Sequence, residues 1–283
     1  VVNRRTLTLD AGTADVQLAG ALGANQALGS LAVLLAGNVR LAAVTTAGTI
    51  TADTISVGAT ATVASVVLRG DLKTNGSTSA GNVRLDAQQV LVDHQGGAGT
   101  LHVATDAAVA DGAITVLGSA QVGSVTAWRD GLTLQSGNGN VDMSTATVTN
   151  LDHLVLVANA ATSVVKLNVI TLGDGAASSG QGSFAVTAGT AVLSGAISTN
   201  GDATGNAGDI GIHAKVQLAG NVLLNSNGAG ADGTITVDQA VDADAVANGR
   251  QWTLDAGTKD IAVNGAVGAN QALGALAIQA ANN

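Results

Sequence analysis

Three aspartates recur at nearly constant spacing in the middle of this chain: Asp111, Asp130 and Asp152 follow one another at intervals of 19 and 22. In a coiled fold with one turn per twenty-odd positions, this spacing would stack three carboxylates in a column suited to acid–base cleavage of polysaccharides. Arg129 and Trp128 are the basic and aromatic residues close by. Each aspartate also stands in a turn-like context, so three separate turn residues are the simpler interpretation. We therefore assign no catalytic residue.

The segment 200–209 is a second candidate, because its sequence NGDATGNAGD offers several oxygen donors in one loop. Hard cations prefer such ligands, and Asp202 and Asp209 are the calcium candidates. The segment does not match the EF-hand loop or the glycine-rich nonapeptide repeat. An Asx-rich turn that satisfies its own backbone also explains it. The sequence predicts no cofactor and no assigned metal site, with calcium as the one ion to test.

The remaining candidates are interpreted as structural. The four histidines are isolated in sequence, whereas zinc needs three converging ligands. Trp128 and Trp252 stand at an offset of 124, which suggests equivalent packing positions at a corner rather than a sugar-stacking platform. Four asparagines at intervals of 25, 23 and 22 predict a ladder of amides from coil to coil: Asn200, Asn225, Asn248 and Asn270.

The composition excludes several classes of protein. All 20 acidic residues are Asp and only four Lys are present, so the usual residues of surface helices are missing. A hydrophobic content of 46% with 11% charged residues is the reverse of the disordered signature. No apolar run reaches the ~18 residues of a membrane helix. A net charge of −9 argues against a nucleic-acid partner.

Short alternating segments separated by Asn-Gly, Asp-Gly and Gly-Asp pairs fill the chain. The segment 234–237, TITV, places Ile235 and Val237 on one face and two threonines on the other. This alternation is typical of half-buried strands joined by tight turns. The expected fold is therefore all-β.

The chain also repeats itself. The segments 5–36 and 250–281 align at an offset of 245, and the two ends overlap by 38 positions, of which 23 are identical. The segment 1–245 is thus one period and 246–283 the start of the next. A weaker repeat at offsets of 121 to 127 divides the period into two halves. No compositional break separates them, so the whole of 1–283 is expected to form one continuous body.

Two folds use many short strands without helices. A β-sandwich would carry large buried aromatics, but the chain has two Trp, one Phe and no Tyr. A parallel β-solenoid has a narrow interior that suits Ala, Val, Ile and Leu, and the absence of Pro suits its continuous hydrogen-bond ladder. Coils of roughly 20–25 residues predict about a dozen coils and a body roughly 60 Å long.

Several short sequence segments are similar to those of a known family: TLDAGT, GANQALG, TNG followed by AGDI, and DGTITV. They resemble the degenerate repeats of very large bacterial exoproteins, the filamentous-haemagglutinin-like adhesins and related strand-repeat surface proteins. The resemblance covers most of the chain and rests on the style of the repeats. It implies a right-handed parallel β-helix, export to the cell surface or the medium, and an adhesive or matrix-forming role.

The expected function is structural and non-enzymatic: an extracellular stalk, adhesin shaft or matrix filament on a bacterial surface. Expected partners are neighbouring repeats, other copies stacked end to end, and surface glycans, without nucleic acid or a membrane span in this segment. A β-helical polysaccharide lyase or hydrolase, or a carbohydrate-binding module, is the alternative.

Overall fold

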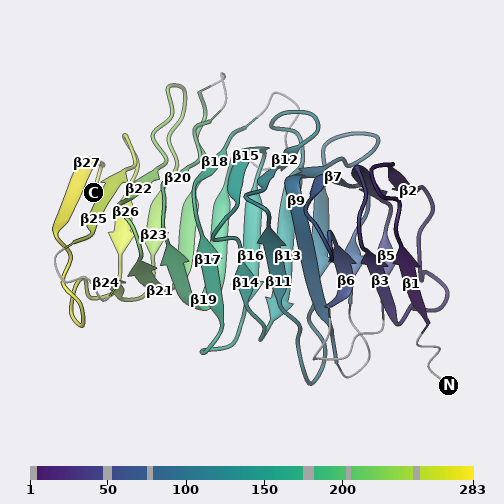
Figure 1. Cartoon of the computed structure of the whole chain (residues 1–283). Helices are drawn as coiled ribbons and strands as arrows, with labels where there is room; N and C mark the ends of the chain where they lie inside the picture. The colour runs from purple at the N-terminus through teal and green to yellow at the C-terminus, as the bar shows by residue number, and fades with distance from the viewer. Residues whose placement is uncertain (1–4, 47–52, 75–78, 175–181, 202–204, 245–248) are drawn as a thin grey trace.

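A computed structural model describes residues 5–46, 53–74, 79–174, 182–201, 205–244 and 249–283. Within these residues every regular element is a β-strand, and every strand pairing is parallel. Figure 1 shows the strands stacked as successive coils, with β1 and β27 at opposite ends. The chain is a parallel β-solenoid of about ten turns, as the sequence predicts.

Each turn contributes strands to three stacked ladders, which we call faces 1, 2 and 3. Face 1 contains β1 (Thr6–Leu9), β3 (Ser30–Val33), β6 (Asp53–Val57), the first half of β9 (Asn82–Val92), β11 (Ile114–Leu117), β14 (Val141–Asp142), β17 (Val164–Leu167), the second halves of β19 (Phe184–Leu193) and β21 (Ile210–Leu218), and β24 (Val241–Ala243). Face 2 contains β2 (Val16–Leu18), β4 (Asn38–Leu41), β7 (Val63–Leu68), the second half of β9, β12 (Gln121–Ser124), β15 (Thr147–Leu151), β18 (Ile170–Leu172), β20 (Ile197–Ser198), β22 (Val222–Asn225), β25 (Gln251–Asp255) and β27 (Ala275–Ala280). Face 3 contains β5 (Val44–Thr45), β8 (Leu72–Lys73), β10 (Thr100–Ala104), β13 (Gly131–Gly137), β16 (Leu154–Ala158), the first halves of β19 and β21, β23 (Ile235–Val237) and β26 (Ile261–Val263).

The turns are longer than the sequence spacing suggests. Leu7 and Val241 occupy the same register position on face 1 and are linked by nine successive pairings, which gives a mean turn length of about 26. The shortest turns on this face advance the chain by 24 positions, as from Thr6 to Ser30. The longest advances it by 31, as from Asn82 to Ala113. The expected coil length of roughly 20–25 residues is therefore too short, because several corner loops are longer than the sequence spacing indicates. At ~4.8 Å per rung, ten turns give a body about 48 Å long.

The core is a set of straight apolar rows that run along the solenoid axis. Because strand side chains alternate and the pairing is in register, every second residue of a face stacks on an equivalent residue one turn later. The row at the centre of face 2 is at most 1% exposed throughout: Val39, Val66, Val90, Val122, Val148, Ile170, Ile197, Leu224 and Leu254. Most of these residues are β-branched, which suits a pleated, buried surface. One continuous core therefore joins all the turns.

The sequence repeat does not equal a whole number of turns. β1 lies on face 1, whereas β25, its counterpart at an offset of 245, lies on face 2. Likewise, β2 is on face 2 and its counterpart β26 is on face 3. One period is thus nine turns plus one face. Equivalent residues of successive periods consequently point in different directions around the axis.

The two copies of the Ala-Asp-Gly motif, at 110–112 and 231–233, build the same loop. In each copy the Asp carboxylate accepts one hydrogen bond from a backbone amide of its own loop and another from the next turn: Ala107 and Asn138 for Asp111, Gly228 and Thr258 for Asp232. A Cβ on the motif glycine would lie 2.1 Å from a carbonyl oxygen of the preceding turn in both copies. Backbone constraints therefore account for the recurrence of the motif.

Asp232 also makes the fold sensitive to acid. Hydrogen bonds from the Thr258 hydroxyl, and then from the Thr258 and Gly228 amides, hold the pKa of Asp232 below its ordinary value of 3.8. A carboxyl with a lowered pKa in the folded state stabilises the fold above its unfolded pKa, and this contribution disappears as the pH falls through the folded pKa. We expect the free energy of unfolding to be flat above about pH 5 and to decline below about pH 4. Urea titrations across this range should show a shallower decline for Asp232→Asn; an unchanged slope would contradict this role.

Candidate functional site

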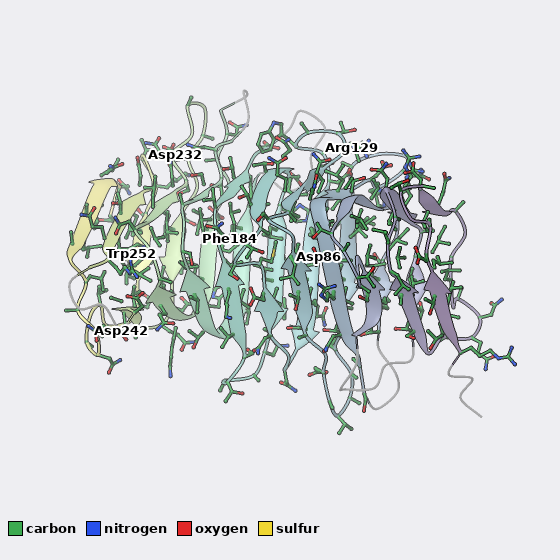
Figure 2. The ribbon with its side chains drawn as sticks, viewed as in Figure 1. Asp86, Arg129, Phe184, Asp232, Asp242 and Trp252 are labelled. Atoms are coloured by element: carbon green, nitrogen blue, oxygen red, sulfur yellow. The ribbon has the colours of Figure 1, made fainter. Side chains whose placement is uncertain are left out.

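The corner between faces 2 and 3 gathers titratable side chains from several turns. We number the turns by their face 1 strands from β1, so that turns 4, 5 and 6 begin at β9, β11 and β14. In these three turns the corner carries five residues that we call the charged corner: Asp93, Arg129, Asp130, Asp152 and His153. The backbone N–H of Asp152 donates to the carbonyl oxygen of Asp130 at 3.1 Å, so these two aspartates lie on adjacent turns. Figure 2 shows Arg129 at the upper edge of the solenoid, well away from the buried Phe184 and Trp252. Two of the three aspartates of the candidate column therefore lie next to each other, although separate turn residues were the simpler interpretation of the sequence.

Asp130 is a fully buried carboxylate whose charge is neutralised in place. Its side chain has no exposed surface. Arg129 contacts both of its oxygens, with Nε 3.1 Å from Oδ1 and Nη2 2.8 Å from Oδ2, and the Ser124 hydroxyl donates to Oδ2 at 2.8 Å. This hydrogen bonding to Asp130 raises the pKa of Arg129. A buried charge of this kind is tolerated only with such partners.

Arg129 continues the network to the preceding turns. Its Nη2 lies 3.3 Å from Oδ1 of Asp93, and Oδ2 of Asp93 accepts from Nε of Arg69 at 3.0 Å. The side chain of Asp93 is 15% exposed, and that of Arg129 is 20% exposed. Two cations and two carboxylates therefore alternate along the corner, from the end of β7 to the start of β13. The alternation ties three successive turns together.

Asp152, His153 and Thr100 form a second line of hydrogen bonds. Nδ1 of His153 lies 2.8 Å from Oδ2 of Asp152, and Nε2 lies 2.8 Å from the Thr100 hydroxyl. Thr100 belongs to turn 4 and His153 to turn 6, so the imidazole spans the turn between them. It can do so because residue 131, which it covers, is glycine: a Cβ there would lie 2.1 Å from Cε1 of the ring. Oδ1 of Asp152 is buried and has no partner among the described residues.

The order carboxylate, imidazole, hydroxyl is the order of a proton relay. The Asp152 carboxylate favours the tautomer with hydrogen on Nδ1, which leaves Nε2 of a neutral ring as an acceptor for the Thr100 hydroxyl. A relay that acts on a substrate must also reach solvent. The His153 side chain is only 14% exposed and that of Asp152 only 1%. The geometry therefore suits a clamp between turns better than an open active site.

A double-mutant cycle tests the clamp. Gly131→Ala should destabilise the chain by about 1–3 kcal/mol, because the new methyl group displaces the imidazole from Thr100. The same substitution in a His153→Ala background should cost much less, since the ring is gone. Urea denaturation of the four proteins gives the coupling energy between the two positions. If the two substitutions lower the free energy of unfolding additively, the glycine at position 131 is not needed to accommodate the His153 ring.

The third aspartate of the candidate carboxylate column lies elsewhere. Asp111 lies in the loop that follows β10 on face 3, where its carboxylate accepts from the amide of Ala107 in the same loop and from that of Asn138 in the next turn. The charged corner lies between faces 2 and 3. The column of three is therefore wrong, and only Asp130 and Asp152 are neighbours. Asp111 fails because the loops differ in length, so equal sequence spacing does not give equal position around the turn.

The calcium candidates are not brought together by what the structure describes. Oδ1 of Asp209 accepts from both the amide and the hydroxyl of Thr234 in the next turn. Asp202 lies outside the described residues. Among the described residues, no group of three or more His, Asp, Glu or Cys side chains has the arrangement of a metal site. Calcium binding stays a prediction.

The asparagine ladder is wrong for the members that the structure describes. Asn225 pairs in register with Ser198, and the side chain of Asn200 donates to the backbone of Asn227 rather than to Asn225. Asn270 donates to Asp242. Asn248 lies outside the described residues. The intervals between the four asparagines are shorter than the mean turn, so these residues drift around the axis.

The two tryptophans occupy different environments. Trp252 points into the core from β25 and is 1% exposed, whereas Trp128 stands in the corner loop before β13 with a φ of 59°. The prediction that the two tryptophans occupy equivalent packing positions is therefore wrong. Of the histidines, His213 pairs with Asp238 across one turn, which lowers the pKa of Asp238.

Three residues of this corner were not expected from the sequence: Thr100, Ser124 and Gly131. No sequence motif marks them. Thr100 and Gly131 act through His153, which is well separated from both along the chain, and Ser124 meets Asp130 across the corner loop, six positions away. No family model, curated protein or solved structure matches the chain. Among the described residues there is no helix long and apolar enough to cross a membrane.

Proposed function

We propose that this chain is a non-enzymatic structural β-solenoid that forms a stalk, adhesin shaft or matrix filament at a bacterial surface. The uninterrupted apolar row on face 2 supports this proposal most directly, because it joins successive strands without a polar break. Such a core makes stability a sum of nearest-neighbour terms and favours a long, stiff body. The extracellular location rests on the resemblance of the repeats to bacterial surface exoproteins.

The charged corner also favours a structural role. A glycan-cleaving site needs two carboxylates that reach substrate on either side of the bond. Both Asp130 and Asp152 are buried, and Asp130 is fully occupied by Arg129 and Ser124. We expect no release of reducing ends or unsaturated products from neutral or acidic polysaccharides. Cleavage that is lost in Asp152→Asn would replace the structural proposal by the lyase or hydrolase alternative.

The edge formed by β27 supports association along the axis. Leu276 and Ile278 are 50% and 59% exposed, whereas Leu31 and Val33, their counterparts in the repeat, are completely buried. Leu31 and Val33 are covered by the next turn, where they pair with β6. A further turn on β27 would bury Leu276 and Ile278 in the same way. Within the proposal, neighbouring repeats or other copies supply that turn.

A pair of charge variants on β27 tests this association. Ile278→Lys should prevent the purified chain from forming rods longer than one molecule, because it places a charge in the apolar contact. Ala277→Lys adds the same charge on the neighbouring residue, which faces away from the core row, and should still assemble. Light scattering and electron microscopy measure both. If the unmodified chain forms only single rods about 48 Å long at every concentration, separate copies do not stack end to end. The proposal of a structural shaft would still stand.

A further inference from the structure

A groove on the outer surface of face 2 carries none of the chemistry considered so far. It has a volume of about 520 Å³ and runs over turns 2 to 5. Its lining consists of one alanine and six uncharged polar residues: Asn38, Ser65, Gln88, Gln89, Ser119 and Gln121. In a chain with 20 aspartates and a net charge of −9, a groove lined without any charged side chain is distinctive.

The strand register places four of these residues in one row. Asn38 pairs with Ser65, Ser65 with Gln89, and Gln89 with Gln121. They point outward because the next residue of each strand belongs to the buried valine row of face 2. The row therefore runs parallel to the solenoid axis, with one polar side chain every ~4.8 Å.

The side chains at one end of the row are hydrogen-bonded to other side chains, whereas, among the described residues, those at the other end are not. Asn38 donates to Asp15 at 2.9 Å, and Ser65 donates to Asn38 at 2.8 Å. The side-chain amides of Gln88, Gln89 and Gln121 are exposed and make no hydrogen bond within the described chain. Each primary amide offers two donors and one acceptor oxygen. Three such groups can satisfy a ligand that both donates and accepts.

We propose that this groove, the amide groove, binds an extended neutral polysaccharide laid along the solenoid axis. The hydroxyl groups of a sugar chain donate and accept at short intervals, which matches the row of amides. The absence of a basic residue in the lining disfavours phosphate and carboxylate polymers. An added peptide strand does not fit, because the backbone groups of face 2 are already used in the ladder.

The expected affinity is low. The lining contains no aromatic side chain to stack on a sugar ring, so binding rests on a few exposed hydrogen bonds. We expect a dissociation constant on the order of millimolar. A rod that presents several such grooves would gain strength from multivalency. This inference is independent of the shaft proposal. A chain that does not bind glycans can still form a rod, and a chain that does not assemble end to end can still bind a glycan in the amide groove.

The test uses the full chain labelled with ¹⁵N and two hexasaccharides, neutral cellohexaose and an anionic galacturonate hexamer. Cellohexaose should shift the side-chain amide signals of Gln88, Gln89 and Gln121, and Gln89→Ala/Gln121→Ala should weaken binding about tenfold or more. Gln217→Ala, at an exposed glutamine on face 1, is the matched control and should bind normally. Melting temperatures verify that the variants fold.

Three outcomes would overturn the proposal. The first is the absence of any shift with cellohexaose up to its solubility limit. The second is equal binding by the double variant and the unmodified chain. The third is binding of the galacturonate hexamer as tight as that of cellohexaose, because the neutral lining would then not select the ligand.

Discussion

Val237→Asp should destabilise the solenoid by ~3 kcal/mol or more, because it buries a charge that has no partner. Val237 is completely buried in β23 and stacks between Ile212 and Val263 of the adjacent turns. Neither neighbour can donate a hydrogen bond from its side chain. In a solenoid each turn is supported by the turns beside it, so loss of one contact row weakens both interfaces.

Thr236→Asp provides the matched control for this prediction. Thr236 lies on the same strand but faces outward, in register with Gly211 and Ala262. The added carboxylate stays in water, so the free energy of unfolding should change by no more than about 0.5 kcal/mol. Urea denaturation and thermal melting compare the two variants. Equal stabilities would contradict the strand register described here.

The second large effect is expected at the charged corner. Arg129→Met should lower the free energy of unfolding by about 3 kcal/mol, because it leaves the carboxylate of Asp130 buried without its cation. The Ser124 hydroxyl alone, 2.8 Å from Oδ2, cannot compensate a full negative charge. The methionine side chain keeps most of the packing volume, which isolates the electrostatic part of the loss.

Two further variants separate this explanation from a loss of packing. Arg69→Met also removes a guanidinium, but Asp93 is partly exposed and keeps Arg129 as a partner. The change should therefore stay within about 1 kcal/mol. Adding Asp130→Asn to Arg129→Met removes the buried charge and should recover much of the stability. If the double variant is no more stable than Arg129→Met, the buried charge is not the cause.

The candidate site was only partly foreseeable. The sequence favoured separate turn residues over a carboxylate column, yet Asp130 and Asp152 lie on adjacent turns because the backbone of Asp152 hydrogen-bonds directly to that of Asp130. The candidate column misplaced Asp111, since the longer loops around it shift its position around the axis. His153 looked isolated in sequence, yet it meets Thr100 at 2.8 Å across a separation of 53 in the chain. Sequence spacing predicts the position of a residue along the solenoid axis far better than its position around that axis.

The sequence by itself determined the fold class. Alternating apolar residues, Asn-Gly and Asp-Gly turns, and the lack of Pro and helix-forming charged residues leave a parallel β-solenoid as the body that buries so many small apolar side chains. These are local properties, and each short strand expresses them independently of its neighbours. The repeat at an offset of 245 was equally plain from the sequence.

Only the tertiary structure decided on which face of the solenoid each repeated strand lies. β1 and β25 are counterparts in the sequence repeat but lie on faces 1 and 2, because corner loops of different lengths add up to nine turns plus one face. All three faces bury alternating apolar residues, so the apolar pattern of a strand does not by itself select its face. The lengths of all the intervening loops, rather than the strand itself, select its face and therefore its polar neighbours. That summation brings Arg129 to Asp93, His153 to Thr100, and the glutamines into one groove.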